Sequence, residues 1–349
     1  MISEQIATEI VKISPDGRND NALRRAGDIL RRGGLVVFPT ETVYGLGANA
    51  RSADACARIF AAKGRPQDNP LIVHVASPAD AEEFCFTTPL YYKLAEAFMP
   101  GPITVIMPSR GVIPKEVTAG LDSVGVRCPS HPVAHHLLVA AGLPVAAPSA
   151  NLSGRPSPTS ADHVIADLFG RVDMIIDGGD ADIGLESTIV KINEEGLILL
   201  RPGAVTYDAL LCVCEKVSIA PAVTDPLSEE ERPLSPGMKY RHYAPKAPLF
   251  LLEGNDEARR SFMIEKIASG ENCLFLCYEE EMTLPGLKAL SIGKKSDFET
   301  QGRRLFACLR EADAAGVQCI YAPMPPRSGM GLALYNRLIR AAAHQVISL

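Results

Sequence analysis

The sequence contains no tryptophan, few aromatic residues and no excess of positive charge. Its 349 residues are 6% aromatic, and 41 acidic residues outnumber 35 lysines and arginines, which gives a formal net charge of −6. Proteins that grip nucleic acid by bulk charge carry a strongly basic surface, and RNA-binding sheets present aromatic side chains. The composition therefore argues against such a protein, although it leaves room for a local basic pocket.

Targeting and metal-binding signals are also missing. No apolar run reaches the roughly 20 residues of a membrane-spanning helix, and polar and acidic residues are spread throughout residues 1–16, which have no signal-peptide core. We therefore expect a cytoplasmic protein with no membrane partner. The nine cysteines lack the paired spacing of zinc sites and lie mostly in apolar runs, so buried reduced thiols are expected.

Familiar catalytic motifs are absent too. The sequence has no Walker-type phosphate loop and no nucleophile elbow or Ser-His-Asp arrangement. A Gly-x-Gly-x-x-Ala stretch at residues 45–50 fits a dinucleotide-binding pattern. However, Pro39 separates it from the preceding strand, and no acidic residue ends a second strand at the expected distance. Dinucleotide binding is therefore disfavoured.

Short apolar strands and helices alternate along most of the chain, which predicts an α/β fold. The length exceeds one ordinary core, so two domains are expected. In the first part, helices are predicted over 21–32, with Asn21 as a possible cap, and over 207–216, and a polar turn is predicted over 40–47.

The pattern changes after about residue 217. Residues 220–247 hold many prolines, which is typical of a stiffened linker. Residues 248–349 alternate again, as expected for a small domain of βαβ units with a parallel sheet.

One segment carries an unusual arrangement of cations. Lys63 and Arg65 flank a glycine, Pro66 stops the preceding helix, and an apolar strand with His74 follows. The cations could simply complement the helix dipole in solvent, and a strand histidine is often a satisfied core residue. A clamp for the phosphates of a nucleotide is the functional alternative.

Further polar residues stand where other apolar strands begin or end. Ser149 and Asn151 follow one such run, Ser123 and Arg127 flank another strand, and Arg201 follows a third. Because α/β sheets bind ligands in a crevice at strand ends, this pattern favours the phosphate-clamp interpretation.

Four blocks of sequence make the chain similar to a known family. They are Phe38 to Leu46 (FPTETVYGL), Lys63 to His74, Pro148 to Asn151 (PSAN) and Ser187 to Val190 (STIV). Together with a linker block at 235–245, they resemble the long, two-domain subtype of the YrdC-like threonylcarbamoyl-AMP synthases.

The resemblance implies a fold and a domain organisation. A YrdC-like twisted mixed sheet with helices would occupy residues 14–210, a linker or lid 211–247, and a smaller Rossmann-like α/β domain 248–349. For the last domain, the residues themselves indicate no chemistry.

The resemblance also implies an activity. Members of the family condense L-threonine, bicarbonate and ATP to threonylcarbamoyl-AMP and pyrophosphate, the first step of threonylcarbamoyladenosine (A37) formation on tRNA. This is a nucleotidyltransferase reaction in which the substrate supplies the nucleophile. Mg²⁺ would arrive with ATP, held by phosphates and water rather than by protein side chains. The product would pass to a tRNA threonylcarbamoyltransferase, with at most a weak tRNA contact.

The family motifs, carried over by position, imply roles for individual residues. Lys63 and Arg65 would be catalytic. The implied ATP-binding residues are Lys63, Arg65, Asn69, Ser123, Ser149, Asn151, Ser157, Arg201 and Tyr243. The implied threonine-binding residues are Thr40, His74, Arg127, Ser149 and Ser187, with Arg127 on the carboxylate. The lid would consist of Tyr240, Arg241 and His242.

Two other functions use the same residues. An RNA-binding module could employ the same cations, but net acidity and the lack of an aromatic-rich strand count against it. A carbamoyl transferase would carry a related domain together with zinc-finger and acylphosphatase segments. The sequence has no Cys-x-x-Cys pairs, which disfavours this function.

Overall fold

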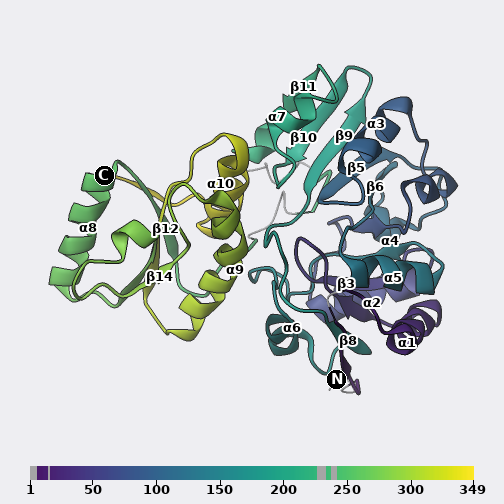
Figure 1. The fold of residues 1–349 in the computed structure, drawn as a ribbon, viewed down its shortest axis with the longest axis horizontal. Coiled ribbons are helices and arrows are strands. Elements are labelled where there is room, and N and C mark those ends of the chain that lie inside the picture. Colours follow the sequence, from purple (N-terminus) through teal and green to yellow (C-terminus); the bar gives the residue numbers. More distant parts are fainter. Residues whose placement is uncertain (1–5, 15, 226–232, 237–241) are drawn as a thin grey trace. The chain divides into compact units, whose positions relative to one another are not determined.

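The computed structural model describes residues 6–14, 16–225, 233–236 and 242–349. The chain forms two compact units, each built around its own sheet (Figure 1). The first comprises residues 1–153, 157–182 and 186–239, and the second 154–156, 183–185 and 240–349. The expected α/β class is confirmed in both.

The first unit is built on an 11-stranded mixed sheet. In spatial order its strands are β1 (Glu9–Lys12), β8 (Met174–Asp177), β2 (Val36–Phe38), β3 (Gly45–Asn49), β7 (Val145–Ala146), β4 (Ile72–His74), β6 (Ser123–Arg127), β5 (Ile103–Pro108), β9 (Thr188–Asn193), β10 (Gly196–Arg201) and β11 (Val217–Ile219). Neighbouring β4 and β6 are parallel, whereas β5 and β6 are antiparallel.

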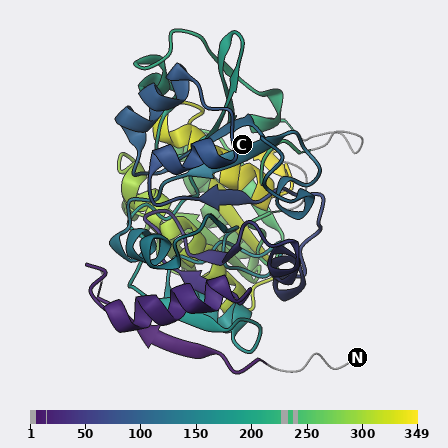
Figure 2. The ribbon, with the colours of Figure 1, turned by 90° about the vertical axis from the view of Figure 1, so that its right-hand side faces the viewer.

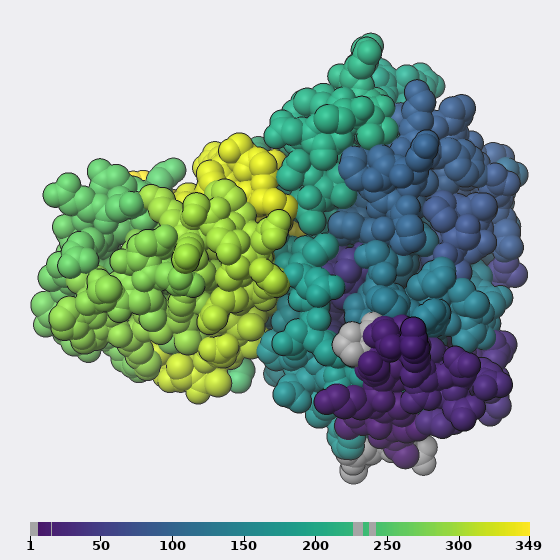
Figure 3. Space-filling view, in the orientation of Figure 1, coloured from purple at the N-terminus to yellow at the C-terminus, as the bar shows by residue number. Residues whose placement is uncertain are grey.

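Helices and short 3-10 turns complete this unit. They are α1 (Asp20–Arg31), α2 (Ala53–Lys63), η1 (Pro78–Glu83), α3 (Pro89–Phe98), α4 (Lys115–Thr118), α5 (Pro132–Ala141), α6 (Ala161–Leu168), α7 (Tyr207–Leu211) and η2 (Pro221–Val223). Figure 2 shows β1 and α1 (purple) next to each other, consistent with their shared apolar cluster. The surface of the unit combines purple, blue and teal segments that are far apart in sequence (Figure 3).

Three local predictions are wrong. Asn19, not Asn21, caps α1, because its side chain accepts the Ala22 N–H. The helix predicted over 207–216 ends at Leu211, and β11 follows it. The turn predicted over 40–47 gives way to β3 at residue 45, where the glycine-rich segment pairs antiparallel with β2.

The two faces of the central sheet differ in character. Val73, Val105 and Val126 of β4, β5 and β6 belong to the largest apolar core. Because side chains alternate along a strand, His74 and Arg127 occupy the opposite face, together with Thr104 of β5. The largest core therefore covers one face, and the other face carries these polar residues beside a smaller apolar cluster that contains Ile72 and Ile106.

The second unit contains a five-stranded sheet in which all neighbouring strands are parallel. In spatial order its strands are β14 (Ala289–Ser291), β13 (Cys273–Cys277), β15 (Cys319–Pro323), β12 (Leu249–Glu253) and β16 (Val346–Ser348). Its helices are α8 (Asp256–Ser269), η3 (Glu279–Glu281), α9 (Phe298–Ala314) and α10 (Gly329–Ala341). The predicted parallel sheet is confirmed. Within the described residues, no helix combines the length and apolar character needed to cross a membrane.

Candidate active site

The site begins with one pair of residues on adjacent strands. His74 ends β4 and Arg127 ends β6, and the two are direct partners in the parallel register. Partners in a ladder point to the same face of the sheet. Both side chains are buried, at 3% and 5% exposure. The sheet therefore places an imidazole and a guanidinium beside each other away from solvent.

The Arg127 guanidinium organises the turn that follows β2. Its Nη2 donates to Glu41 Oε1 at 2.7 Å, Thr42 Oγ1 at 2.8 Å and Thr40 Oγ1 at 3.4 Å. Glu41 Oε2 also accepts the Ser130 N–H, so this buried carboxylate is held from two sides. The Nε atom of Arg127 is buried and has no hydrogen-bond partner among the described residues. An anion bound here would find an unused donor.

His74 stands beside this cation as a neutral imidazole. Burial, reinforced by the positive charge of Arg127, lowers the pKa of His74 to about 3. Its Nδ1 lies 3.2 Å from the Ile72 carbonyl oxygen. At neutral pH the imidazole therefore offers hydrogen bonds to a ligand without adding charge.

The low pKa of His74 predicts a pH-dependent stability. An unfolded histidine titrates near 6.5, so between about pH 6.5 and 3 the unfolded chain binds a proton that the folded chain excludes. Stability should therefore fall as the pH drops through this window, by up to about 1.4 kcal/mol per pH unit. We expect His74→Gln to remove this contribution and flatten the decline.

Chemical denaturation at several pH values would measure the difference. Ile72→Val on the same strand is the matched control, since it removes a methyl group without changing a titrating residue, and its slope should equal that of the parent chain. Equal slopes for His74→Gln and the parent chain would contradict the assignment.

A second part of the site fastens the turn after β7. Lys63, at the end of α2, is 2% exposed, and its ammonium donates to the carbonyl oxygens of Ser149 and Asn151. Ser149 Oγ also donates to Asn151 Oδ1 at 2.5 Å. Gly64 in the left-handed conformation (φ 61°) ends α2 directly after this lysine. Lys63 thus fixes the turn whose side chains the family resemblance assigns to ATP.

Backbone hydrogen bonds connect these two parts. Gly45 and Ser149 form an isolated antiparallel bridge, and the Ala150 N–H donates to the Tyr44 carbonyl oxygen at 2.8 Å. The turn containing Thr40 and the turn containing Ser149 therefore belong to one assembly.

A third part lies across β5, β9 and β10. The Arg201 Nε donates to the Ser187 carbonyl oxygen at 3.0 Å, and its Nη2 donates to Ser187 Oγ at 3.1 Å. Ser187 Oγ lies 2.8 Å from Thr104 Oγ1. Arg201 is paired in register with Ile189, so Ser187 and Arg201 share the sheet face of Thr104 and Arg127.

Other predicted ATP residues lie around these clusters. Arg65 is half-buried, and its Nη2 donates to the carbonyl oxygens of Asn69 (3.3 Å) and Pro70 (3.2 Å). Ser157 Oγ donates to Glu186 within the same unit. Ser123 starts β6, at the end of the strand opposite Arg127.

Described linker residues cover the face near Ser123. Leu234 packs against the apolar cluster that contains Ile72 and Ile106. Leu234 and Pro236 line a pocket there with Ser123 and Thr104, and it has a volume of only about 10 Å³. That is room for about one water molecule, so the linker fills this part of the sheet face.

Two more of the predicted residues, His242 and Tyr243, make aromatic contacts. Tyr243 belongs to the second unit, where its ring stacks on Phe306 of α9 at 5.2 Å between centroids. The half-buried His242 has its ring 5.7 Å from that of Tyr243. The predicted lid residues Tyr240 and Arg241 lie outside the described residues.

Sequence reasoning missed Glu41 and Thr104, and it preferred Thr40 to Thr42, which stands in the same motif. Glu41 and Thr42 lie within the motif Phe38 to Leu46. A carboxylate between two threonines in an apolar stretch could have indicated that these side chains belong to the site. Thr104 carried no such signal, because a threonine inside an apolar strand is ordinary. Only its register on β5 places it beside Ser187.

Known proteins match the chain over nearly its whole length. A family model described as "Telomere recombination" matches residues 28–203, and one described as "Threonylcarbamoyl-AMP synthase, C-terminal domain" matches residues 205–343. The threonylcarbamoyl-AMP synthase of Bacillus subtilis is 43% identical over 332 residues, covering 94% of this chain and 95% of the relative. The chain belongs to the threonylcarbamoyl-AMP synthase family.

Two further comparisons with the family agree. The threonylcarbamoyl-AMP synthase of Pyrococcus abyssi is 42% identical over 337 residues, covering 93% of this chain and 95% of the relative. The crystal structure of P. abyssi Sua5 complexed with L-threonine superposes with a TM-score of 0.90 at 40% identity, covering 98% of this chain and 99% of that one. The family resemblance expected from the sequence is confirmed across both units.

Proposed function

We propose that this chain condenses L-threonine, bicarbonate and ATP to threonylcarbamoyl-AMP and pyrophosphate, acting as a nucleotidyltransferase. The observation that carries the proposal is the buried Arg127 guanidinium, whose Nε has no described partner and which lies beside the Thr40 and Thr42 hydroxyls. The threonine carboxylate is an anion that suits a guanidinium. The relatives' shared name supports the same reaction.

The reaction requires positioning and neutralisation of charge rather than a protein nucleophile. The threonine amine attacks carbon dioxide derived from bicarbonate, loses a proton and forms a carbamate. A carbamate oxygen then attacks the α-phosphorus of ATP, and the bond to the bridging oxygen breaks with release of pyrophosphate. Cations and oriented dipoles stabilise such a phosphoryl transition state.

The site residues divide between the two substrates. Arg127 would hold the threonine carboxylate, and the neutral His74, Thr40 and Ser187 would fix its remaining polar groups. The cations Lys63, Arg65 and Arg201 would face the triphosphate. The other proposed ATP residues are Asn69, Ser123, Ser149, Asn151, Ser157 and Tyr243.

Mg²⁺ would enter with ATP, held by phosphate oxygens and water. Among the described residues, no three His, Cys, Asp or Glu side chains are grouped to hold a metal ion.

The linker would act as a movable cover, because ATP cannot reach Ser123 while Leu234 and Pro236 fill the pocket there. Such a cover would exclude water from the labile anhydride product. The product would then pass to a tRNA threonylcarbamoyltransferase in the cytoplasm.

Pyrophosphate release from ATP tests the proposal. We expect release that requires both L-threonine and bicarbonate and that fails when serine or glycine replaces threonine. Threonine-independent release, or no release together with tight RNA binding, would reject the synthase reaction in favour of a binding module.

Glu41 offers a test of the carboxylate site by stability alone. Breaking a buried ion pair by neutralising one partner costs about 3–5 kcal/mol, so Glu41→Gln should lower the melting temperature. Threonine should recover part of this loss, because its carboxylate would replace the lost charge beside Arg127. Thermal unfolding with and without threonine would then show a larger ligand-induced shift in Glu41→Gln than in the parent chain.

Glu83→Gln is the matched control. Glu83 is 57% exposed in its pair with Arg51, and surface pairs contribute about 0–1 kcal/mol. Its melting temperature and its threonine shift should match those of the parent chain. A threonine shift in Glu41→Gln no larger than in the parent chain would place the carboxylate elsewhere.

A further inference from the structure

The second unit contains a pocket at the edge of its sheet where ligands of parallel sheets bind. Its walls come from the segments after β12, β13 and β14, and its volume is about 160 Å³. Asp256, Arg259 and Arg260 begin α8, Tyr278 and Glu280 follow β13, and Lys295 precedes α9. This volume is enough for a molecule the size of an amino acid, and the pocket lies outside the site described above.

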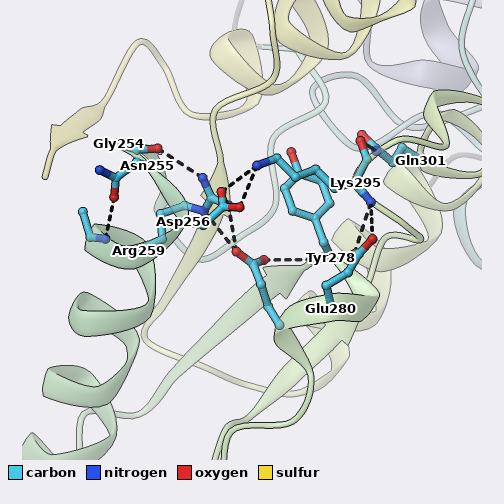
Figure 4. A network of polar contacts seen from close by, with 10 residues as sticks. Gly254, Asn255, Asp256, Arg259, Tyr278, Glu280, Lys295 and Gln301 are labelled. Carbon is cyan, nitrogen blue, oxygen red and sulfur yellow. Dashed lines mark hydrogen bonds and ion pairs between the residues drawn. The ribbon is translucent and has the colours of Figure 1, made fainter.

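A polar network fixes the walls of this pocket (Figure 4). Lys295 Nζ reaches both oxygens of Asp256, at 2.6 and 2.8 Å. The buried Arg259 connects Asp256 at 2.8 Å to Glu281 at 2.9 Å. Gln301 donates to the backbone carbonyl of Lys295 at 3.1 Å. The three segments are thus tied together without a ligand, which makes the pocket pre-formed.

Two donors at the pocket are not used by this network. Tyr278 is only 4% exposed, and its hydroxyl donates its proton to none of the described residues. Burial raises the pKa of Tyr278 to about 12, so the hydroxyl keeps its proton. Arg260 is exposed and forms no ion pair with the described residues. The Tyr278 hydroxyl lies at the pocket wall and keeps a proton that a ligand could accept.

The charges of the lining define the chemistry of the ligand. Three carboxylates (Asp256, Glu280, Glu281) and three cations (Arg259, Arg260, Lys295) line the pocket, so their formal charges sum to zero. A nucleotide or polyphosphate would need a net positive site. A zwitterion instead needs an unused donor group for its carboxylate and an acceptor for its ammonium. Glu280, whose oxygens accept only weak bonds at 3.2 and 3.3 Å from the Lys295 N–H, supplies the acceptor.

We propose that this pocket binds a free α-amino acid. Its carboxylate would lie between Arg260 and the Tyr278 hydroxyl, and its ammonium would face Glu280. The buried side chains of Met263 and Leu284 also line the pocket, so they would contact the ligand's side chain. The small domain would thereby sense an amino acid independently of the reaction in the first unit.

Saturation-transfer NMR on the full chain would test this, with the twenty protein amino acids as probes at millimolar concentration. At least one amino acid should bind, and both Tyr278→Phe and Arg260→Gln should weaken its binding about tenfold. Lys294→Gln is the matched control, because this exposed cation is next to Lys295 but does not line the pocket.

Arg127→Lys separates this site from the threonine site. An amino acid bound in the second unit should keep its signal in that variant. The proposal is overturned if no amino acid binds, if Arg127→Lys abolishes every signal, or if Tyr278→Phe and Arg260→Gln leave all signals unchanged. Should Tyr278→Phe fail to fold, the exposed Arg260→Gln decides alone.

Discussion

Arg127→Lys should lower kcat/KM for threonine by about 100-fold, equivalent to ~3 kcal/mol, and leave KM for ATP unchanged. The guanidinium already serves Glu41 and Thr42 through one nitrogen, and its planar fork keeps other N–H groups for a ligand. A lysine ammonium carries charge but lacks this fork, so it cannot hold the same partners and a carboxylate together. Steady-state pyrophosphate release over a range of threonine concentrations measures the effect.

Arg110→Lys provides the comparison for this experiment. Arg110 lies in the same unit, donates to the Cys85 carbonyl oxygen and packs over Phe86, but it takes no part in the site. Its kinetics should match those of the parent chain. If Arg127→Lys raised KM for ATP instead of KM for threonine, Arg127 would belong to the nucleotide.

Lys63→Met should reduce pyrophosphate release by about a thousandfold or more. The change removes a buried ammonium that makes two charge-assisted hydrogen bonds, to Ser149 and Asn151, each worth about 1.5–3 kcal/mol. Two effects act together: the turn at 149–151 loses the hydrogen bonds that hold it, and the triphosphate loses a nearby cation. ATP binding, measured by calorimetry without threonine, should weaken in parallel.

The exposed Lys93 on α3 supplies the control, and Lys93→Met should retain full turnover. Circular dichroism would test whether Lys63→Met keeps its fold. A folded Lys63→Met chain with normal turnover would show that Lys63 serves neither the turn nor ATP during catalysis.

The sequence predicted most elements because their signals are local. The strand with His74 and the helices ending at Lys63 and Ala314 follow from apolar periodicity and breaking residues. The strand over Gly45–Asn49 was missed because glycines rarely build strands, and only its pairing with β2 and β7 stabilises it. The edge strand β11 is short and half exposed, so it carried little pattern.

The candidate site was predicted less completely than the fold. Family motifs identified His74, Arg127 and Lys63, but nothing local indicated that Lys63 would donate to the carbonyls of a turn 86 residues away. The selection of Glu41 as the counter-ion of Arg127 likewise depends on strand order rather than on spacing. Long-range contacts of this kind follow from topology, which a single sequence encodes only indirectly.

The pairing of His74 with Arg127 on neighbouring strands constrains the register in which β4 and β6 must fold. Slipping either strand by one residue would exchange its two faces. Val73 or Val126 would then stand in the site, and an imidazole or a guanidinium would enter the apolar core at a cost of several kcal/mol. Molecules with a misaligned strand would thus be both inactive and unstable. The residues proposed to bind the substrate therefore also favour the correct register of the sheet.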